Sequence, residues 1–226
     1  MGTTQRWKQT LIYKNIKMRN TVITKEIQAE LTPTVVLQDL LEGNQRYINN
    51  KLTASDVPAL VEQTTGGQFP KAVILSCIDS RVPVELVFDQ TIGDVFVARV
   101  AGNFENVDIL GSMEYSCKVA GSKLVFVLGH ESCGAVKAAC DGVELGNITA
   151  LLSNIAPAAK KSSEEVEGVA DSSNKEFVAK TVKNNVLMTI ERIREKSPIL
   201  AEMEKNGEIS IVGGVYSLKT GKVSML

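Results

Sequence analysis

The sequence predicts an α/β fold built on a mainly parallel central sheet flanked by helices. Three short apolar runs, at residues 72–76, 95–100 and 124–128, contain β-branched side chains and end at polar or glycine-containing segments. A helical pattern over residues 108–119 separates the second and third runs. Strands that alternate with helices form right-handed crossovers, and these produce a parallel, doubly wound sheet. Ligands bind beyond the carboxyl ends of such strands, so the residues after each run are candidates for a functional site.

The length indicates one domain. A chain of 226 residues can bury one core well and is short for two full domains. We predict a single α/β domain over residues 31–226, preceded by an exposed tail or packing arm at residues 1–30. Residues 1–25 carry six basic side chains and no acidic one, which gives a weak organelle-targeting signal without the apolar stretch of a secretory signal. Met18 is an alternative start.

The remaining elements are predicted from periodicity and from turn residues. In the first part of the chain they are a helix over 34–49 after the turn Thr32-Pro33-Thr34 and a loop over 50–70. After the third strand they are a helix over 133–140, then one apolar segment and a solvated helix or loop within 147–173. The chain ends with a long amphipathic helix over 175–196 closed by Ser197-Pro198, a strand over 209–218, and a turn at 219–222 into a last strand at 223–226.

Composition excludes several classes of partner. The 25 Lys and Arg residues nearly balance the 26 Asp and Glu residues, so the net charge favours neither nucleic acid nor an anionic membrane. No apolar run approaches the roughly 20 residues that span a bilayer. The four cysteines are too few for a disulfide framework and fit a reducing compartment, so we expect a cytoplasmic protein that acts on a small neutral or anionic substrate.

Two clusters of polar residues follow predicted strands. Cys77-Ile78-Asp79-Ser80-Arg81 comes after the first run, and Gly129-His130-Glu131-Ser132-Cys133 comes after the third. Either cluster alone is weak, since an isolated cysteine is more often a buried packing residue. Together they supply two thiols and one imidazole, a soft set of three ligands that suits zinc. An early position in the helix over 133–140 would favour the thiolate form of Cys133.

The number of histidines limits the chemistry further. His130 is the only histidine in the chain. If it binds a metal, no second imidazole can carry protons, and a relay must use carboxylates, tyrosine, water or external buffer.

These residues resemble the β-class carbonic anhydrases. The match rests on the two clusters, on residues 93–103 (GDVFVARVAGN), on Gly43-Asn44-Gln45-Arg46-Tyr47 and on Tyr216-Ser217-Leu218-Lys219-Thr220-Gly221, and it extends from about Leu31 to the last strands. The resemblance implies Zn²⁺ held by Cys77, His130 and Cys133, with water or hydroxide in the fourth position. Zinc-bound hydroxide would then hydrate CO₂ to bicarbonate.

Asp79 and Arg81 correspond to the family's dyad. An aspartate paired with arginine stays ionised and can orient the hydroxide. In a closed state, Asp79 would instead bind zinc as the fourth ligand. The resemblance is to the plant-like subgroup, which favours the open state.

The resemblance also implies a substrate pocket and an oligomer. Gln68 would bind a substrate oxygen, Phe96 and Tyr115 would form apolar walls, and Ala101 and Gly134 complete the predicted pocket. For Phe96 and Tyr115, plain core packing is the alternative. Family members form dimers whose partner chain helps to wall the active site, so we expect a homodimer or higher homo-oligomer, with a tetramer as one option.

Two alternative functions share the same motifs. One is a family relative that acts on another small heterocumulene such as CS₂. The other is a non-catalytic zinc-stabilised scaffold in which Asp79 permanently fills the fourth position.

Overall fold

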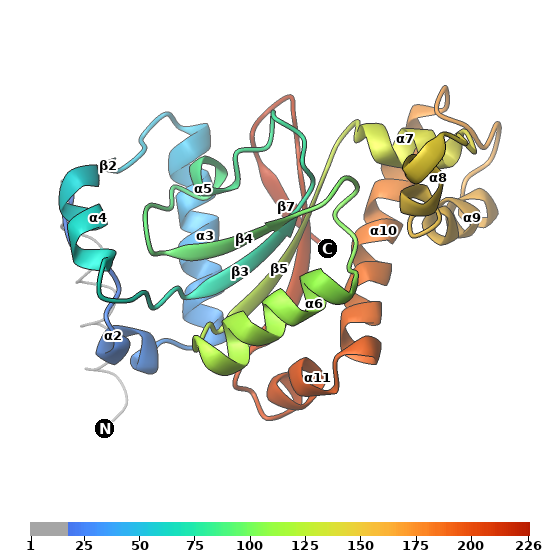
Figure 1. The fold of residues 1–226 in the computed structure, drawn as a ribbon. Helices are drawn as coiled ribbons and strands as arrows, with labels where there is room; N and C mark the ends of the chain where they lie inside the picture. The colour runs from blue at the N-terminus through green and yellow to red at the C-terminus, as the bar shows by residue number, and fades with distance from the viewer. Residues whose placement is uncertain (1–17) are drawn as a thin grey trace.

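The computed structural model describes residues 18–226 (Figure 1). The basic segment considered for targeting falls mostly on residues 1–17, outside the described part. Within the described residues, the predicted α/β architecture is confirmed: a five-stranded sheet lies between two layers of helices. No helix of residues 18–226 is long and apolar enough to cross a membrane.

The sheet has the strand order β4-β3-β5-β6-β7. Its strands are β3 (Ala72–Ser76), β4 (Val95–Arg99), β5 (Leu124–His130), β6 (Ser210–Tyr216) and β7 (Val223–Met225). The first four are parallel, and β7 runs antiparallel to β6. Every residue of β3 and β5 is buried. Burial on both faces explains why these central strands read as continuous apolar runs instead of alternating ones.

Helices cover both faces of the sheet (Figure 1). On one face, α3 (Pro33–Ile48) and α5 (Val84–Val87) pack on side chains such as Ile74 and Phe126. On the other face, α6 (Val107–Glu114), α10 (Lys175–Lys196) and α11 (Pro198–Lys205) pack on the alternate side chains, such as Leu75 and Val127. Successive strand residues point to opposite faces, so each strand contributes to both cores.

Local capping fixes the bounds of the long helices. The Thr32 side chain accepts a hydrogen bond from the Val35 N–H at the start of α3, and Asn174 does the same for Phe177 at the start of α10. Ser and Thr, like Asn, satisfy N–H groups that have no partner inside the helix. Ser197 ends α10 and also caps α11 by accepting from the Leu200 N–H, so a second helix follows the predicted stop.

The prediction of a loop over residues 50–70 is wrong in part. This segment contains β2 (Ala54–Ser55) and α4 (Val57–Thr64). Asp56 caps α4, and a proline lies in its first turn. Proline is favoured in the first turn of a helix, so the residue that suggested a loop in fact starts a helix. β2 pairs in parallel with β1 (Met18–Arg19), which joins this segment to the predicted arm.

Other segments are more helical than predicted. Residues 18–30 also include α2 (Lys25–Glu30), and the helix expected over 108–119 continues from α6 into a π-helical turn, η1 (Tyr115–Val119). Residues 147–173 contain most of α8 (Gly146–Leu152) and all of α9 (Ala156–Glu165). α9 is more than a solvated helix, because its buried Ser162 accepts a hydrogen bond from Asn184 of α10.

Candidate metal centre

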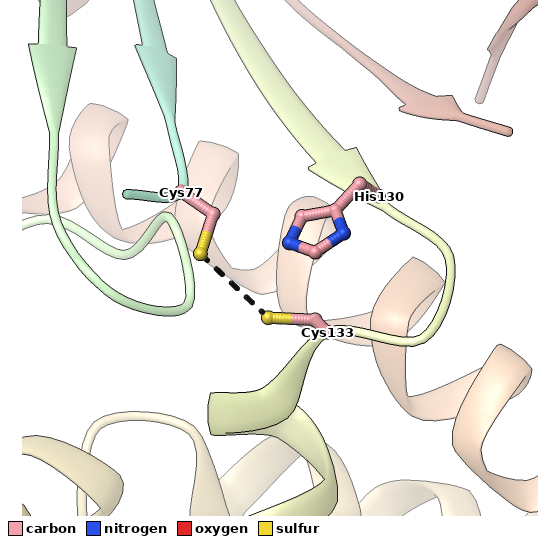
Figure 2. A group of neighbouring side chains, drawn as sticks. All are labelled: Cys77, His130 and Cys133. Atoms are coloured by element: carbon pink, nitrogen blue, oxygen red, sulfur yellow. Dashed lines mark hydrogen bonds between the residues drawn. The ribbon is translucent and has the colours of Figure 1, made fainter. Parts of the chain in front are cut away.

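The sheet topology brings the two clusters together. Cys77 directly follows β3, and His130 is the last residue of β5, the parallel neighbour of β3. Cys133 lies at the N-cap of α7 (Gly134–Cys140). The ligand atoms of these three residues lie within 4.8 Å of one another, and the two Sγ atoms are 3.8 Å apart (Figure 2). The three side chains point toward one shared space at the carboxyl edge of the sheet.

A tight turn connects His130 to Cys133. Ser132 has a φ of 53°, in the left-handed region, which turns the chain back toward the sheet. Two hydrogen bonds join the turn to the end of β6. The Glu131 N–H donates to the Tyr216 carbonyl at 2.9 Å, and the hydroxyl of the next residue, Ser217, donates to the Glu131 carboxylate at 2.8 Å. Glu131 therefore serves the turn that places two ligands.

His130 presents one free ring nitrogen to the cluster. The imidazole is fully buried, and its Nδ1 lies 2.9 Å from the Glu131 carbonyl oxygen. A carbonyl can only accept, so this bond assigns the proton to Nδ1 and leaves the Nε2 lone pair free. Nε2 has no hydrogen-bond partner among the described residues. A buried, unpartnered nitrogen beside two thiols fits a metal ion, and the donor set fits zinc.

The two sulfurs shift each other's pKa in opposite directions. The hydrogen bonds from the Cys133 thiol and from the Gly102 N–H lower the pKa of Cys77. The hydrogen bond to Cys77, together with burial, raises the pKa of Cys133. The helix start acts on Cys133 in the expected direction, because the Val136 and Ala135 N–H groups lower its pKa, while the neighbouring sulfur and burial raise it.

The Asp79 carboxylate is held beside this cluster by Arg81. The backbone N and Nε of Arg81 each donate to Oδ1 at 2.9 Å, and Nη2 donates to Oδ2 at 2.7 Å. These bonds hold the pKa of Asp79 well below its usual range, so the group is a carboxylate. Its Oδ2 lies 3.8 Å from the His130 Nε2, near the cluster and outside hydrogen-bond distance.

Arg99 is a functional residue that the motifs did not single out. It ends β4, and its guanidinium donates to the backbone carbonyls of Cys77, Asp79 and Val82 at 2.9, 2.8 and 3.1 Å. The loop that carries one ligand and the dyad is therefore bound to the neighbouring strand. The available signal was a charged residue within the otherwise apolar run over residues 95–100.

The predicted pocket residues divide into two groups. Ala101 and Gly134 adjoin the centre, because Ala101 precedes the Gly102 that bonds Cys77 and Gly134 follows Cys133. Phe96 lies in β4 opposite Val73, four residues before Cys77 along β3, which is about 13 Å at 3.3 Å per residue. Its ring packs edge-on against Tyr115 at 6.2 Å.

Gln68 also lies elsewhere in the chain. It lines a surface hollow with Thr64, Gly67 and Gly93, beyond the end of α4. None of the residues that line this hollow is a candidate ligand or a member of the dyad. The other two cysteines also lie outside the ligand cluster. Cys117 is buried in the core between the sheet and α6, α10 and α11, where burial raises its pKa to about 12. The Cys140 thiol is hydrogen-bonded to the Thr181 hydroxyl.

Comparison with known proteins gives one consistent result. The family model described as "Carbonic anhydrase" matches residues 72–223. "Carbonic anhydrase 2" of Mycobacterium tuberculosis is 33% identical over 198 residues, which are 84% of this chain and 91% of that protein. The carbonic anhydrase of Mycolicibacterium smegmatis is 33% identical over 199 residues, 85% and 93% of the two chains. Among solved structures, a Coccomyxa β-carbonic anhydrase in complex with acetazolamide superposes with a TM-score of 0.68 at 27% identity, covering 84% of this chain and 86% of that one.

Proposed function

The chain belongs to the β-carbonic anhydrase family, and from that premise we propose that Cys77, His130 and Cys133 bind one zinc ion that supports the hydration of CO₂ to bicarbonate. The observation that carries the proposal is the free, buried Nε2 of His130 within 4.8 Å of two thiol sulfurs. When bound in such a site, zinc supplies a hydroxide nucleophile near neutral pH by lowering the pKa of a coordinated water. Three protein ligands leave the fourth position that a catalytic site needs.

We propose that Asp79 orients the nucleophile. Arg81 binds both carboxylate oxygens, which keeps Asp79 ionised and able to accept a hydrogen bond. A carboxylate held in this way is also restrained from turning onto the metal. The arrangement supports the open state and an enzyme over a scaffold closed by Asp79.

Stopped-flow CO₂ hydration combined with metal analysis tests the proposal. We expect about one zinc per chain, and loss of both zinc and activity in Cys77→Ser. Cys117→Ser is the matched control, because Cys117 is an equally buried thiol outside the cluster. A wild-type protein with one zinc per chain and no hydration between about pH 6.5 and about pH 9 would contradict the enzyme and favour the scaffold.

We further propose that the working unit is a homodimer in which Gln68, Phe96 and Tyr115 wall the partner's site. The support is an apolar stripe on α6 and η1, where Val107, Tyr115 and Val119 are 80%, 55% and 71% exposed. Val107 is the first residue of α6, and Tyr115 and Val119 are the first and last residues of η1, which continues it. An exposed apolar face of this kind favours burial against another chain.

Mixed dimers test the shared site. Gln68→Ala and Cys77→Ser chains should each have low activity alone. When co-expressed, they should regain part of it, since one site then has an intact metal cluster and an intact partner residue. A monomer in sedimentation velocity, or no recovery on mixing, would contradict the shared site.

We also propose a reducing compartment, such as the cytoplasm, for this protein. Cys77, Cys117, Cys133 and Cys140 are all free thiols, and two of them are proposed ligands that oxidation would remove. Localisation of a fluorescent fusion in the source cells is the test, and a secreted protein would contradict the proposal.

A further inference from the structure

The Cys77 sulfur accepts a hydrogen bond from a backbone turn that follows β4. The Gly102 N–H lies 3.3 Å from the sulfur. The turn is closed by the Asn103 N–H, which donates to the Val100 carbonyl at 3.0 Å. Gly102 and Asn103 both have positive φ values, 84° and 42°. Glycine adopts a positive φ at no steric cost, whereas Asn103 does so at some cost, which the structure around the turn must offset.

Asn185 of α10 is hydrogen-bonded to that turn. Its side chain is 1% exposed, and its Nδ2 donates to the Gly102 carbonyl at 2.7 Å. Its Oδ1 is buried without a hydrogen-bond partner among the described residues. Burying an amide with one group unsatisfied is unfavourable. Packing alone therefore does not explain why an asparagine occupies this position. The hydrogen bond that its amide does make goes to Gly102, the residue that bonds the proposed ligand Cys77.

Ile155 packs closely against Gly102. A Cβ on Gly102 would lie 2.3 Å from Cδ1 of Ile155, a fully buried side chain. Gly102 is thus confined between Ile155 on one side and the Asn185 amide on another.

We propose that Asn185 is a positioning residue for the metal centre: it holds Gly102 so that the Gly102 N–H sets the orientation and donor strength of the Cys77 sulfur. An N–H bonded to a thiolate withdraws charge from it and fixes its direction. Partners that orient metal ligands typically change metal affinity or activity by about 10- to 100-fold when removed. The inference rests on the zinc site of the proposed function.

Substitutions at two adjacent asparagines of α10 test this role. Asn185→Leu and Asn185→Ala remove the bond to Gly102, the first with the same branched shape and a larger volume and the second without overpacking. Asn184→Leu and Asn184→Ala are the matched controls. Asn184 is 4% exposed, and its amide binds Ser162 and Glu165 of α9 instead of the metal cluster.

Zinc affinity and a spectroscopic signature are the readouts. We expect both Asn185 variants to bind zinc about tenfold or more weakly in competition with a chelator. The thiolate-to-cobalt charge-transfer band of the Co²⁺-substituted protein should also shift. The Asn184 variants should change neither quantity, although both pairs should lower the melting temperature of the zinc-free protein.

The outcomes separate this inference from the proposed function. If the wild type binds zinc and hydrates CO₂ while the Asn185 variants match the Asn184 controls in zinc affinity and cobalt spectrum, the inference is overturned and the function stands. If the wild type binds no zinc, both are overturned. If Asn185→Leu does not fold, Asn185→Ala decides the question.

Discussion

Gly129→Ala should destabilise the protein through a steric conflict next to a metal ligand. Gly129 precedes His130 in β5, and α10 crosses it closely. A Cβ at this position would lie 2.6 Å from Cγ2 of Val186 and 3.4 Å from Cγ1 of Val182. Favourable carbon contacts begin near 3.5 Å, so the nearest pair overlaps by about 1 Å.

Neither side of this contact can adjust easily. Val186 and Val182 are 0% and 3% exposed, and β-branched side chains in a helix have essentially one rotamer. α10 also packs closely on β6, because Val186 lies 2.5 Å from the position of a Cβ on Gly213, so moving α10 away from Gly129 would also separate it from a second strand. Overpacking of a well-packed core lowers the free energy of unfolding by about 1 to 3 kcal/mol, and we expect a value in this range.

Urea denaturation of the zinc-free protein and zinc competition measure the two consequences. The urea midpoint should fall. Zinc affinity should also fall, because metal–ligand distances tolerate only about 0.2 Å and a displaced β5 moves His130 by more. Gly134→Ala is the matched control: no atom lies within 4 Å of its Cβ, so its free energy of unfolding should be unchanged or raised by up to about 1 kcal/mol. A Gly129→Ala protein as stable as the wild type would refute the steric argument.

The further predictions concern the dyad, the metal and proton transfer. Arg81→Gln should reduce kcat/KM about 10²-fold with zinc content unchanged, since it releases Asp79 from its position; metal analysis alongside stopped-flow kinetics checks both. Because Arg81 keeps the pKa of Asp79 below its ordinary value of 3.8, Asp79→Asn should lose activity by the same factor at every pH from about 7 to about 9. The stability that this ionised carboxylate contributes should be present above about pH 4 and lost as the pH falls through its lowered folded-state pKa; acid denaturation of wild type and Asp79→Asn measures it, and equal acid sensitivity would speak against the pairing. A strong chelator should lower the melting temperature of the wild type and leave that of Cys133→Ser unchanged, because zinc stabilises only a chain that can bind it. With His130 as the only histidine, turnover at low buffer concentration should be limited by proton transfer and should rise with added imidazole, and buffer-independent turnover would contradict this.

The sequence predicted those parts of the structure that depend on local pattern. β3 and α10 have the predicted bounds, because a strand buried on both faces is an unbroken apolar run and a long helix carries its own caps. α4 was missed because Asp56 and Pro58 resemble a loop until the capping bond is seen. The ligand cluster could be predicted because parallel strands end at one edge, which brings Cys77 and His130 together.

Contacts between distant segments could not be predicted in this way. The amide of Asn185 meets Gly102 across 83 positions, and no local pattern marks it. Phe96 and Tyr115 were assigned to the pocket by resemblance, yet within one chain they pack on each other away from the cluster. A sequence motif identifies which residue types a site needs, whereas their places relative to one another depend on tertiary and quaternary packing.

α10 contacts residues next to two of the ligands, although it contributes no ligand itself. It packs against Gly129 beside His130, and it bonds Gly102, which in turn bonds Cys77. Binding energy at a metal is folding energy for whatever its ligands hold in place. Zinc bound by His130 and Cys77 would therefore also stabilise the packing of α10 against β5 and against the turn after β4.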